Sequence, residues 1–199
     1  MKQQRRVVGS ISLSLDGRVT GPGGPFDMGW IVPHAVSPES RSHMLTVTGA
    51  ATTALLGRRN YEGFAGFWPA VAGDEAADPA DREFSRWLNE VEKVVVSTTV
   101  REGSWHHTRF TAESPAVVVK RLRDQPGGDI VVPASASIIR ALLAAGELDR
   151  LSITLCPELV GGGAYLFDEA PAGSSWSLTA ATTTSSGAIC LLYDRRLPS

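Results

Sequence analysis

The sequence predicts an α/β domain built on a mostly parallel sheet, with helices on both faces and an antiparallel edge. Short Val-rich runs alternate with helical segments through most of the 199 residues, which is typical of parallel strands covered on both faces. The last two apolar runs, 175–181 and 188–193, are separated by a turn with no room for a crossover helix, so they are expected to pair antiparallel. No repeat or linker divides the chain, and we expect one domain over residues 1–199.

Strands are expected at apolar runs that end at turn residues. The first covers residues 5–15, where Val, Ile and Leu are interspersed with Ser before the turn signal Asp16-Gly17. The other expected strands are 54–56, 93–97, 108–110, 129–132 and 148–156, together with the closing pair.

Helices are expected where a capping residue and a proline open a segment, as at Ser114-Pro115, or where apolar residues recur with helical spacing. The expected helices are 38–50, 81–89, 114–123 and 135–145. Two stretches are expected to be loops: the Gly- and Pro-rich residues 18–36, and residues 65–79 with the motif Phe67-Trp-Pro69.

Composition excludes several classes of function. A formal net charge of −2, with basic residues scattered along the chain, provides no field for nucleic acid or anionic membranes. No apolar stretch reaches the roughly 20 residues of a membrane span, and no secretory apolar segment follows the N-terminus, so we expect a cytoplasmic protein. Cys156 and Cys190 are expected to be buried free thiols. The four histidines have no metal-ligand spacing, and no metal is expected.

Three predicted strand ends carry residues that suit phosphate. They are Gly57-Arg58-Arg59, Ser97-Thr-Thr99 and Pro133-Ala-Ser-Ala-Ser137. Ligands of open parallel sheets bind outside the carboxyl ends of the strands, where arginines, hydroxyls and free helix N–H groups favour an anion. Taken singly, each feature is also an ordinary turn or cap former. The chain lacks G-x-G-x-x-G and G-x-x-x-x-G-K-[ST], which argues against a Rossmann fingerprint or a P-loop.

A longer pattern runs almost from end to end, and its most distinctive part is Leu55-Leu-Gly-Arg-Arg-Asn-Tyr-Glu62. Its other parts are residues 12–17, 67–69, 93–97, 105, 129–132, 142–149, 157–163 and 166–167. In these residues the chain resembles the dihydrofolate reductase-like proteins, most closely the branch with the reductase domain of the bifunctional riboflavin-biosynthesis enzyme. The resemblance implies a mixed sheet of about eight strands, NADPH as cofactor, a small heterocyclic substrate and a homodimer, which an edge strand at 188–193 could support.

The resemblance also implies cofactor-binding residues. Arg58 and Ser97, with Thr98 beside it, would hold the 2′-phosphate of NADPH, and Arg59 would be a weaker partner. The full implied set is Gly57, Arg58, Arg59, Ser97, Thr98, Val132, Pro133, Ala134, Ser135, Ala136 and Ser137. The family usually has Gly where this chain has Ala134; if the turn needs a positive φ, the alanine costs roughly 1 kcal/mol.

Candidates on the substrate side are Asp16, Trp30, Met44, Val47 and Trp68, and candidates for catalysis are Asp16 and His43. Each has a structural alternative. The residues of the 38–50 helix could pack in the core, the tryptophans could anchor loops, and Asp16 could close an Asx-turn after the first strand. His43 is a candidate proton donor because its helix is expected to face the cleft.

The leading hypothesis is an NADPH-dependent reductase that transfers hydride to a small planar heterocycle, pteridine- or pyrimidine-like, or to a related carbonyl or imine. Two alternatives stay open. One is a binding module of the same fold that has lost hydride transfer, which Ala134 and the lack of a clear proton donor favour. The other is a dimer-forming structural protein without a ligand, against which the arginine beside a hydroxyl-tipped strand argues.

Overall fold

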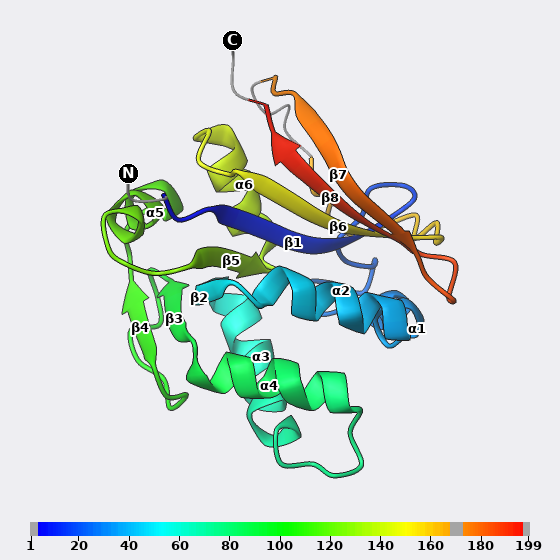
Figure 1. The fold of residues 1–199 in the computed structure, drawn as a ribbon, viewed down its shortest axis with the longest axis horizontal. Helices are drawn as coiled ribbons and strands as arrows, with labels where there is room; N and C mark the ends of the chain where they lie inside the picture. Colours follow the sequence, from blue (N-terminus) through cyan, green and yellow to red (C-terminus); the bar gives the residue numbers. More distant parts are fainter. Residues whose placement is uncertain (1–3, 168–172, 197–199) are drawn as a thin grey trace.

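The computed structural model describes residues 4–167 and 173–196, which fold around one sheet of eight strands. The order across the sheet is β4-β3-β2-β5-β1-β6-β8-β7 (Figure 1). The strands are β1 (Val7–Ser14), β2 (Ala51–Gly57), β3 (Glu92–Val96), β4 (Thr108–Thr111), β5 (Asp129–Pro133), β6 (Arg150–Cys156), β7 (Trp176–Thr183) and β8 (Ile189–Arg195). The first six strands in this order pair parallel, and β8 and β7 complete the sheet antiparallel, which confirms the predicted fold class.

Helices cover both faces of the sheet (Figure 1). They are α1 (Val32–Ala35), α2 (Pro38–Thr48), α3 (Arg58–Val71), α4 (Pro79–Glu90), α5 (Pro115–Arg123) and α6 (Ala136–Ala144), with a short 3₁₀ helix at Gly29–Ile31. Alternate residues of each strand point to opposite faces, so Leu55 packs with α5 and α6 while Leu56 packs with α3 and α4. No helix in the described ranges is both long and apolar enough to span a bilayer.

Three expectations about local structure are wrong. Residues 65–71 continue α3 instead of forming a loop, because Trp68 packs on Phe84 of α4 at 4.7 Å between ring centroids and Pro69 lies only two residues before the helix end. The 18–36 stretch contains the 3₁₀ helix and α1. The third error concerns the sheet edge: β8 lies between β6 and β7, so the exposed antiparallel edge is β7.

The two cysteines are buried free thiols, as predicted. Cys156 and Cys190 lie on the neighbouring strands β6 and β8. Burial is the main cause that raises the pKa of the Cys156 thiol to about 12, so this group stays protonated and unreactive at neutral pH.

Candidate functional site

A cavity of about 1060 Å³ opens where the carboxyl ends of neighbouring strands meet. Residues that follow β2, β3 and β5 line it, together with Ile11 of β1 and the loop from Val19 to Met28. This position is the one that parallel α/β sheets use for ligands, because the loops at strand ends diverge there. The volume lies at the upper end of the range for small-molecule and cofactor sites, so the cavity has room for a large ligand.

Two helices begin at the cavity without a side-chain cap. Gly57 precedes α3 and Ser135 precedes α6, and neither provides a capping hydrogen bond. The caps of α2, α4 and α5 are different: Ser37, Asp78 and Ser114 each accept a bond from a backbone N–H of the first turn. Free N–H groups at a helix start attract anions, and here the first turns of both helices line one cavity.

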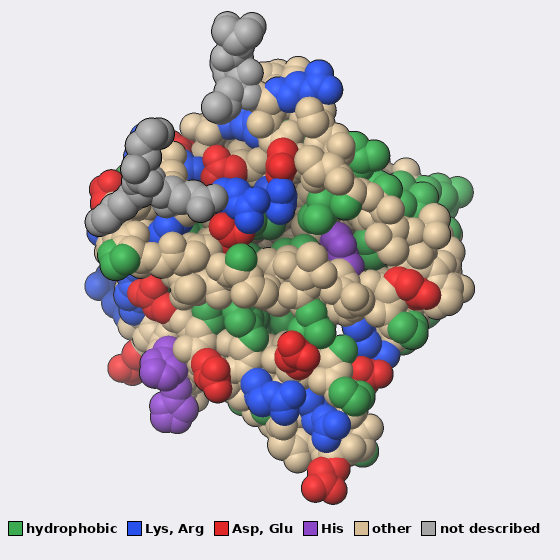
Figure 2. All heavy atoms as spheres, in the orientation of Figure 1, with side chains coloured by type: hydrophobic (Ala, Val, Ile, Leu, Met, Phe, Trp, Pro, Cys, Tyr) green, Lys and Arg blue, Asp and Glu red, His purple; other side chains and the backbone are tan. Residues whose placement is uncertain are grey.

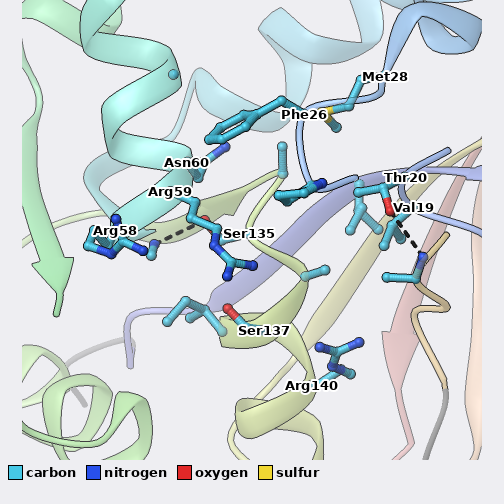
Figure 3. A pocket seen from close by; sticks show the side chains of 18 of the residues that line it. Val19, Thr20, Phe26, Met28, Arg58, Arg59, Asn60, Ser135, Ser137 and Arg140 are labelled. Carbon is cyan, nitrogen blue, oxygen red and sulfur yellow. Dashed lines mark hydrogen bonds between the residues drawn. The ribbon is translucent and has the colours of Figure 1, made fainter. Parts of the chain in front are cut away.

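Three arginines are the only charged residues among the described residues that line the cavity, namely Arg58, Arg59 and Arg140. Figure 3 shows Arg59 extending between Ser135 and Ser137, and within the described residues nothing pairs with its guanidinium. Arg140 donates to the carbonyl of Tyr165 at 2.7 Å. With no carboxylate in the lining, the cavity favours anionic ligands.

Arg58 has a partner within its own helix. Its Nη1 lies 3.0 Å from both carboxylate oxygens of Glu62, one turn further along α3. Both side chains are about two-fifths exposed, and ion pairs of this kind contribute little to stability. An incoming phosphate can therefore compete with Glu62 for the Arg58 guanidinium.

The hydroxyl residues after β3 have two roles: Ser97 stabilises the turn that follows the strand, and Ser97 and Thr98 both line the cavity. Ser97 is buried, and its oxygen accepts bonds from the backbone N–H groups of Thr99 and Val100 at 3.2 and 2.8 Å. Its O–H hydrogen remains available to a ligand. Thr98 is exposed and lines the cavity. Ser97 thus holds the turn and also presents a donor beside Arg58.

Ala134 occupies the left-handed region, with φ of 51°. Its N–H donates to the carbonyl of Ser10 at 2.7 Å, which ties the turn after β5 to β1. The turn does need a positive φ at this position. The alanine side chain therefore destabilises the turn by about 1 kcal/mol relative to glycine.

Residues 5–190 match the RibD C-terminal domain. The chain belongs to the RibD C-terminal domain family. It is 24% identical over 191 residues to the uncharacterized protein YyaP of Bacillus subtilis (strain 168), covering 96% of this chain and 95% of that protein.

Solved structures of RibD-like proteins share the fold. A protein assigned to riboflavin biosynthesis from Shewanella sp. PV-4 superposes with a TM-score of 0.71 at 18% identity, covering 96% of this chain and 99% of the other. A pyrimidine reductase-like protein from Corynebacterium diphtheriae has a TM-score of 0.66 at 14% identity, with coverage of 98% and 93%.

A two-activity protein of Thermotoga maritima contains the same fold within a longer chain. It is a diaminohydroxyphosphoribosylaminopyrimidine deaminase/5-amino-6-(5-phosphoribosylamino)uracil reductase, with a TM-score of 0.65 at 11% identity. The superposition covers 98% of this chain and 58% of that one.

Most of the cofactor-binding residues proposed from the sequence line the cavity of this RibD C-terminal domain. They are Gly57, Arg58, Arg59, Ser97, Thr98, Ala134, Ser135, Ala136 and Ser137. Val132 and Pro133 do not line it, because both are buried in β5. These two residues end β5 directly before the turn at Ala134.

The substrate-side candidates of the RibD C-terminal domain lie elsewhere. Met44 packs with the aromatic cluster around Phe84, and Val47 is buried against β1 and β5. Trp68 belongs to the same aromatic cluster as Met44. Trp30 lies in the 3₁₀ helix and does not line the cavity either. The structure therefore places Met44, Val47 and Trp68 in packing positions, and Trp30 outside the cavity lining.

Asp16 lies outside the cavity as well. Its carboxylate accepts hydrogen bonds from the Ser14 hydroxyl at 2.6 Å and from the N–H groups of Val160 and Gly161 at 3.0 and 2.9 Å. These three donors, led by Ser14, hold the pKa of the carboxyl well below its usual range. Asp16 is thus an ionised tether between the turn after β1 and the loop after β6.

His43 faces the sheet instead of the cavity. Its Nε2 lies 2.8 Å from Ser152 Oγ of β6, and burial lowers the pKa of the imidazole. The helix that carries it, α2, packs over β1 and β6 (Figure 1), and none of its residues lines the cavity. His43 therefore contacts β6 and is not one of the residues that line the cavity.

Sequence reasoning missed several lining residues. Phe26 and Met28 come from the Gly- and Pro-rich stretch, and Asn60 and Phe64 from the first two turns of α3. Asn60 follows directly after the two arginines, so its place in the first helical turn was a usable signal. The family resemblance implies that the loop after Asp16-Gly17 borders the ligand, but it does not single out Phe26 and Met28, because the loop folds back on α3 only in three dimensions.

Proposed function

We propose that this chain is an NADPH-dependent reductase that transfers hydride to a small planar heterocycle, pteridine- or pyrimidine-like, or to a related carbonyl or imine. The observation that carries the proposal is the pairing of two uncapped helix starts with arginines on one cavity at the strand ends. Family membership and the reductase names of the structural relatives support the same reaction class.

The lining residues match the separate phosphate groups of NADPH. The starts of α3 and α6 offer backbone donors to a pyrophosphate, and the small side chain of Ala136 leaves room for it. Arg58, with the O–H of Ser97 and the exposed Thr98 beside it, would hold the 2′-phosphate that distinguishes NADPH from NADH. When bound, the nicotinamide supplies the hydride.

The chain itself contributes binding, orientation and exclusion of water. Ile11, Val19 and Ala164 add apolar surface to the cavity lining. No lining residue in the described part of the chain is an Asp, Glu, His, Cys, Lys or Tyr. We infer that the proton that accompanies the hydride comes from solvent, and that the pH dependence of turnover follows the substrate.

The experiment is a titration of the purified protein with NADPH and NADH by calorimetry. Oxidation of NADPH is then followed in the presence of dihydropterins and oxidised pyrimidines. The proposal expects tighter binding of NADPH than of NADH and transfer of label from deuterated NADPH to a product carbon. Equal and millimolar-weak binding of the two cofactors would contradict it.

A second candidate, a binding module without hydride transfer, has one observation in its favour. Ala134 adds a methyl group at a left-handed turn on the cavity wall, where it narrows the approach to a cofactor. The two candidates differ in the labelling experiment, because a binding module holds NADPH without transferring deuterium to any acceptor.

We also propose that the chain forms a homodimer. The edge strand that would pair is β7, because β8 lies inside the sheet. The outer side of β7 has no neighbouring strand in the described sheet, and its residues Trp176–Thr183 carry neither charge nor proline to discourage pairing. Light scattering on wild type and on Ala180→Pro checks this, since a proline in an edge strand prevents further pairing and shifts a dimer to monomer.

A further inference from the structure

We propose that one end of the cavity selects an uncharged planar heterocycle with an amide-like edge and rejects phosphorylated substrates. This end, called here the ring end, is formed by residues 20–28 and by Asn60, Gly63 and Phe64 of α3. The inference rests on the proposed reductase function, because it assigns the arginine-lined remainder of the cavity to the cofactor.

The charges of the cavity are unevenly placed. Arg58 and Arg59 belong to the start of α3 and Arg140 to α6, and Figure 3 shows Arg59 and Arg140 on the side of Ser137, away from Phe26 and Met28. The described residues of the ring end that line the cavity include no basic side chain. Nearby, Asp27 is engaged with its own loop, where its carboxylate accepts a bond from the Gly23 N–H at 2.9 Å. A dianionic phosphate bound against residues 20–28 would therefore meet no basic side chain of the ring-end lining, and it would lie on the loop that carries the Asp27 carboxylate.

Phe26 provides a stacking surface. Phe26 is 64% exposed although it lines the cavity, and a Cβ added at Gly63 would lie 4.0 Å from its ring. The ring thus lies near α3 and remains largely exposed, and Met28 beside it offers an adaptable thioether (Figure 3). A flat ligand would cover this ring and remove exposed apolar surface, which favours aromatic heterocycles over branched or polyhydroxylated molecules.

Asn60 provides the polar recognition. Its Oδ1 is buried and has no hydrogen-bond partner among the described residues. Leaving such an acceptor unpaired is unfavourable, so a ligand that donates a hydrogen bond to it gains affinity. The carboxamide can accept from a ring N–H and donate to the neighbouring ring carbonyl, which is the pattern of a lactam edge. Figure 3 places Asn60 between Phe26 and Arg59, where the ring end meets the arginines.

This selectivity would separate the chain from the Thermotoga maritima protein, which is named for a substrate with a phosphoribosyl group. Uridine and uridine 5′-monophosphate are suitable probes: both carry a flat ring with an N–H between two carbonyls, and they differ only by the phosphate. Ligand-observed NMR titrations on protein saturated with NADP⁺ measure both dissociation constants. We expect uridine to bind at least about tenfold more tightly than the monophosphate.

Two variants on α3 distinguish the loss of recognition by Asn60 from a general disruption of the fold. Asn60→Leu removes the amide at similar volume and is expected to weaken uridine binding about tenfold, by more than any change in NADP⁺ affinity. Gly66→Ala is the matched control on α3, because a Cβ there meets nothing within 4 Å and Gly66 does not line the cavity. It is expected to leave both dissociation constants unchanged.

The inference is overturned if the monophosphate binds as tightly as uridine, if neither probe binds, or if Asn60→Leu binds uridine as wild type does. Binding of NADP⁺ tests the reductase proposal, and binding of the two probes tests the ring end. A protein that fails to bind NADP⁺ contradicts the reductase proposal, whereas normal NADP⁺ binding with equal affinity for the two probes contradicts only the assignment of the ring end.

Discussion

The backbone N–H of Gly57 donates a hydrogen bond of 3.1 Å to Ser135 Oγ, although 78 residues separate the two in the chain. This bond joins the ends of β2 and β5 at the point where α3 and α6 begin. Because the hydroxyl of Ser135 is used across the two strands, it does not cap its own helix. The same contact thus holds the cavity wall together and leaves the first turn of α6 open to an anion.

Removal of this bond gives the first prediction. Ser135→Ala leaves the Gly57 N–H without its partner and is expected to lower the free energy of unfolding by about 1 kcal/mol. Ser137→Ala is the matched control, because Ser137 is exposed and its hydroxyl forms no hydrogen bond with the described residues. Urea unfolding of both variants measures the difference, and equal stabilities would show that the Gly57 bond contributes nothing.

Ala134 gives the second prediction. Ala134→Gly relieves the left-handed backbone at φ of 51° and is expected to raise the free energy of unfolding by up to about 1 kcal/mol, after the extra entropy of glycine in the unfolded chain. Ala136→Gly, at the first residue of α6 where φ is not positive, has no strain to relieve and is expected to lower it by up to about 0.5 kcal/mol. Chemical denaturation measures the free energy of unfolding of both variants. Changes of opposite sign support strain at Ala134, whereas a loss of stability in both variants contradicts it.

Arg58 gives the third prediction, which tests cofactor choice. Arg58→Ala is expected to raise the dissociation constant for NADPH about 10- to 100-fold, because it removes a charged donor to the 2′-phosphate. Affinity for NADH, which lacks this phosphate, changes little. The exposed Arg86 of α4 lies outside the cavity, so Arg86→Ala serves as a charge-matched control. A parallel loss for both cofactors would place Arg58 elsewhere than at the 2′-phosphate.

His43 gives the fourth prediction, which concerns pH. Burial lowers the pKa of its imidazole from the ordinary 6.5, so the folded state resists protonation that the unfolded chain accepts. Below about pH 6.5 the unfolded state binds more protons, and the free energy of unfolding falls as the pH drops toward the lowered pKa. His43→Gln is expected to flatten this decline in urea titrations at several pH values, whereas His106→Gln on the surface keeps it.

The fifth prediction treats Asp16 as a tether. Asp16→Asn keeps the size of the side chain but removes the charge and one acceptor oxygen, so the N–H groups of Val160 and Gly161 are expected to exchange with solvent faster. The wild-type protein is expected to show the same change in strong acid, because the contribution of Asp16 is complete above the ordinary carboxyl pKa and disappears as the pH falls through its lowered pKa. Hydrogen exchange by NMR measures both, and unchanged protection in the variant would refute the tether.

Local patterns in the sequence determined much of this protein. The alternation of apolar strands with capped helices predicts the parallel sheet, because strand periodicity and N-cap chemistry act over a few residues. Parallel strands align their carboxyl ends, so the three phosphate-suited strand ends were expected to meet, and the cavity includes residues from all three.

Only the tertiary structure decided how individual side chains are used. Asp16, His43, Met44 and Trp68 are all compatible with a site in the sequence, yet each finds its partner on an element that is distant in the chain or across a packed face. The same holds for the inner position of β8 and for Phe26 against α3. The physical reason is that burial and hydrogen-bond satisfaction depend on contacts between distant segments, which no local pattern records.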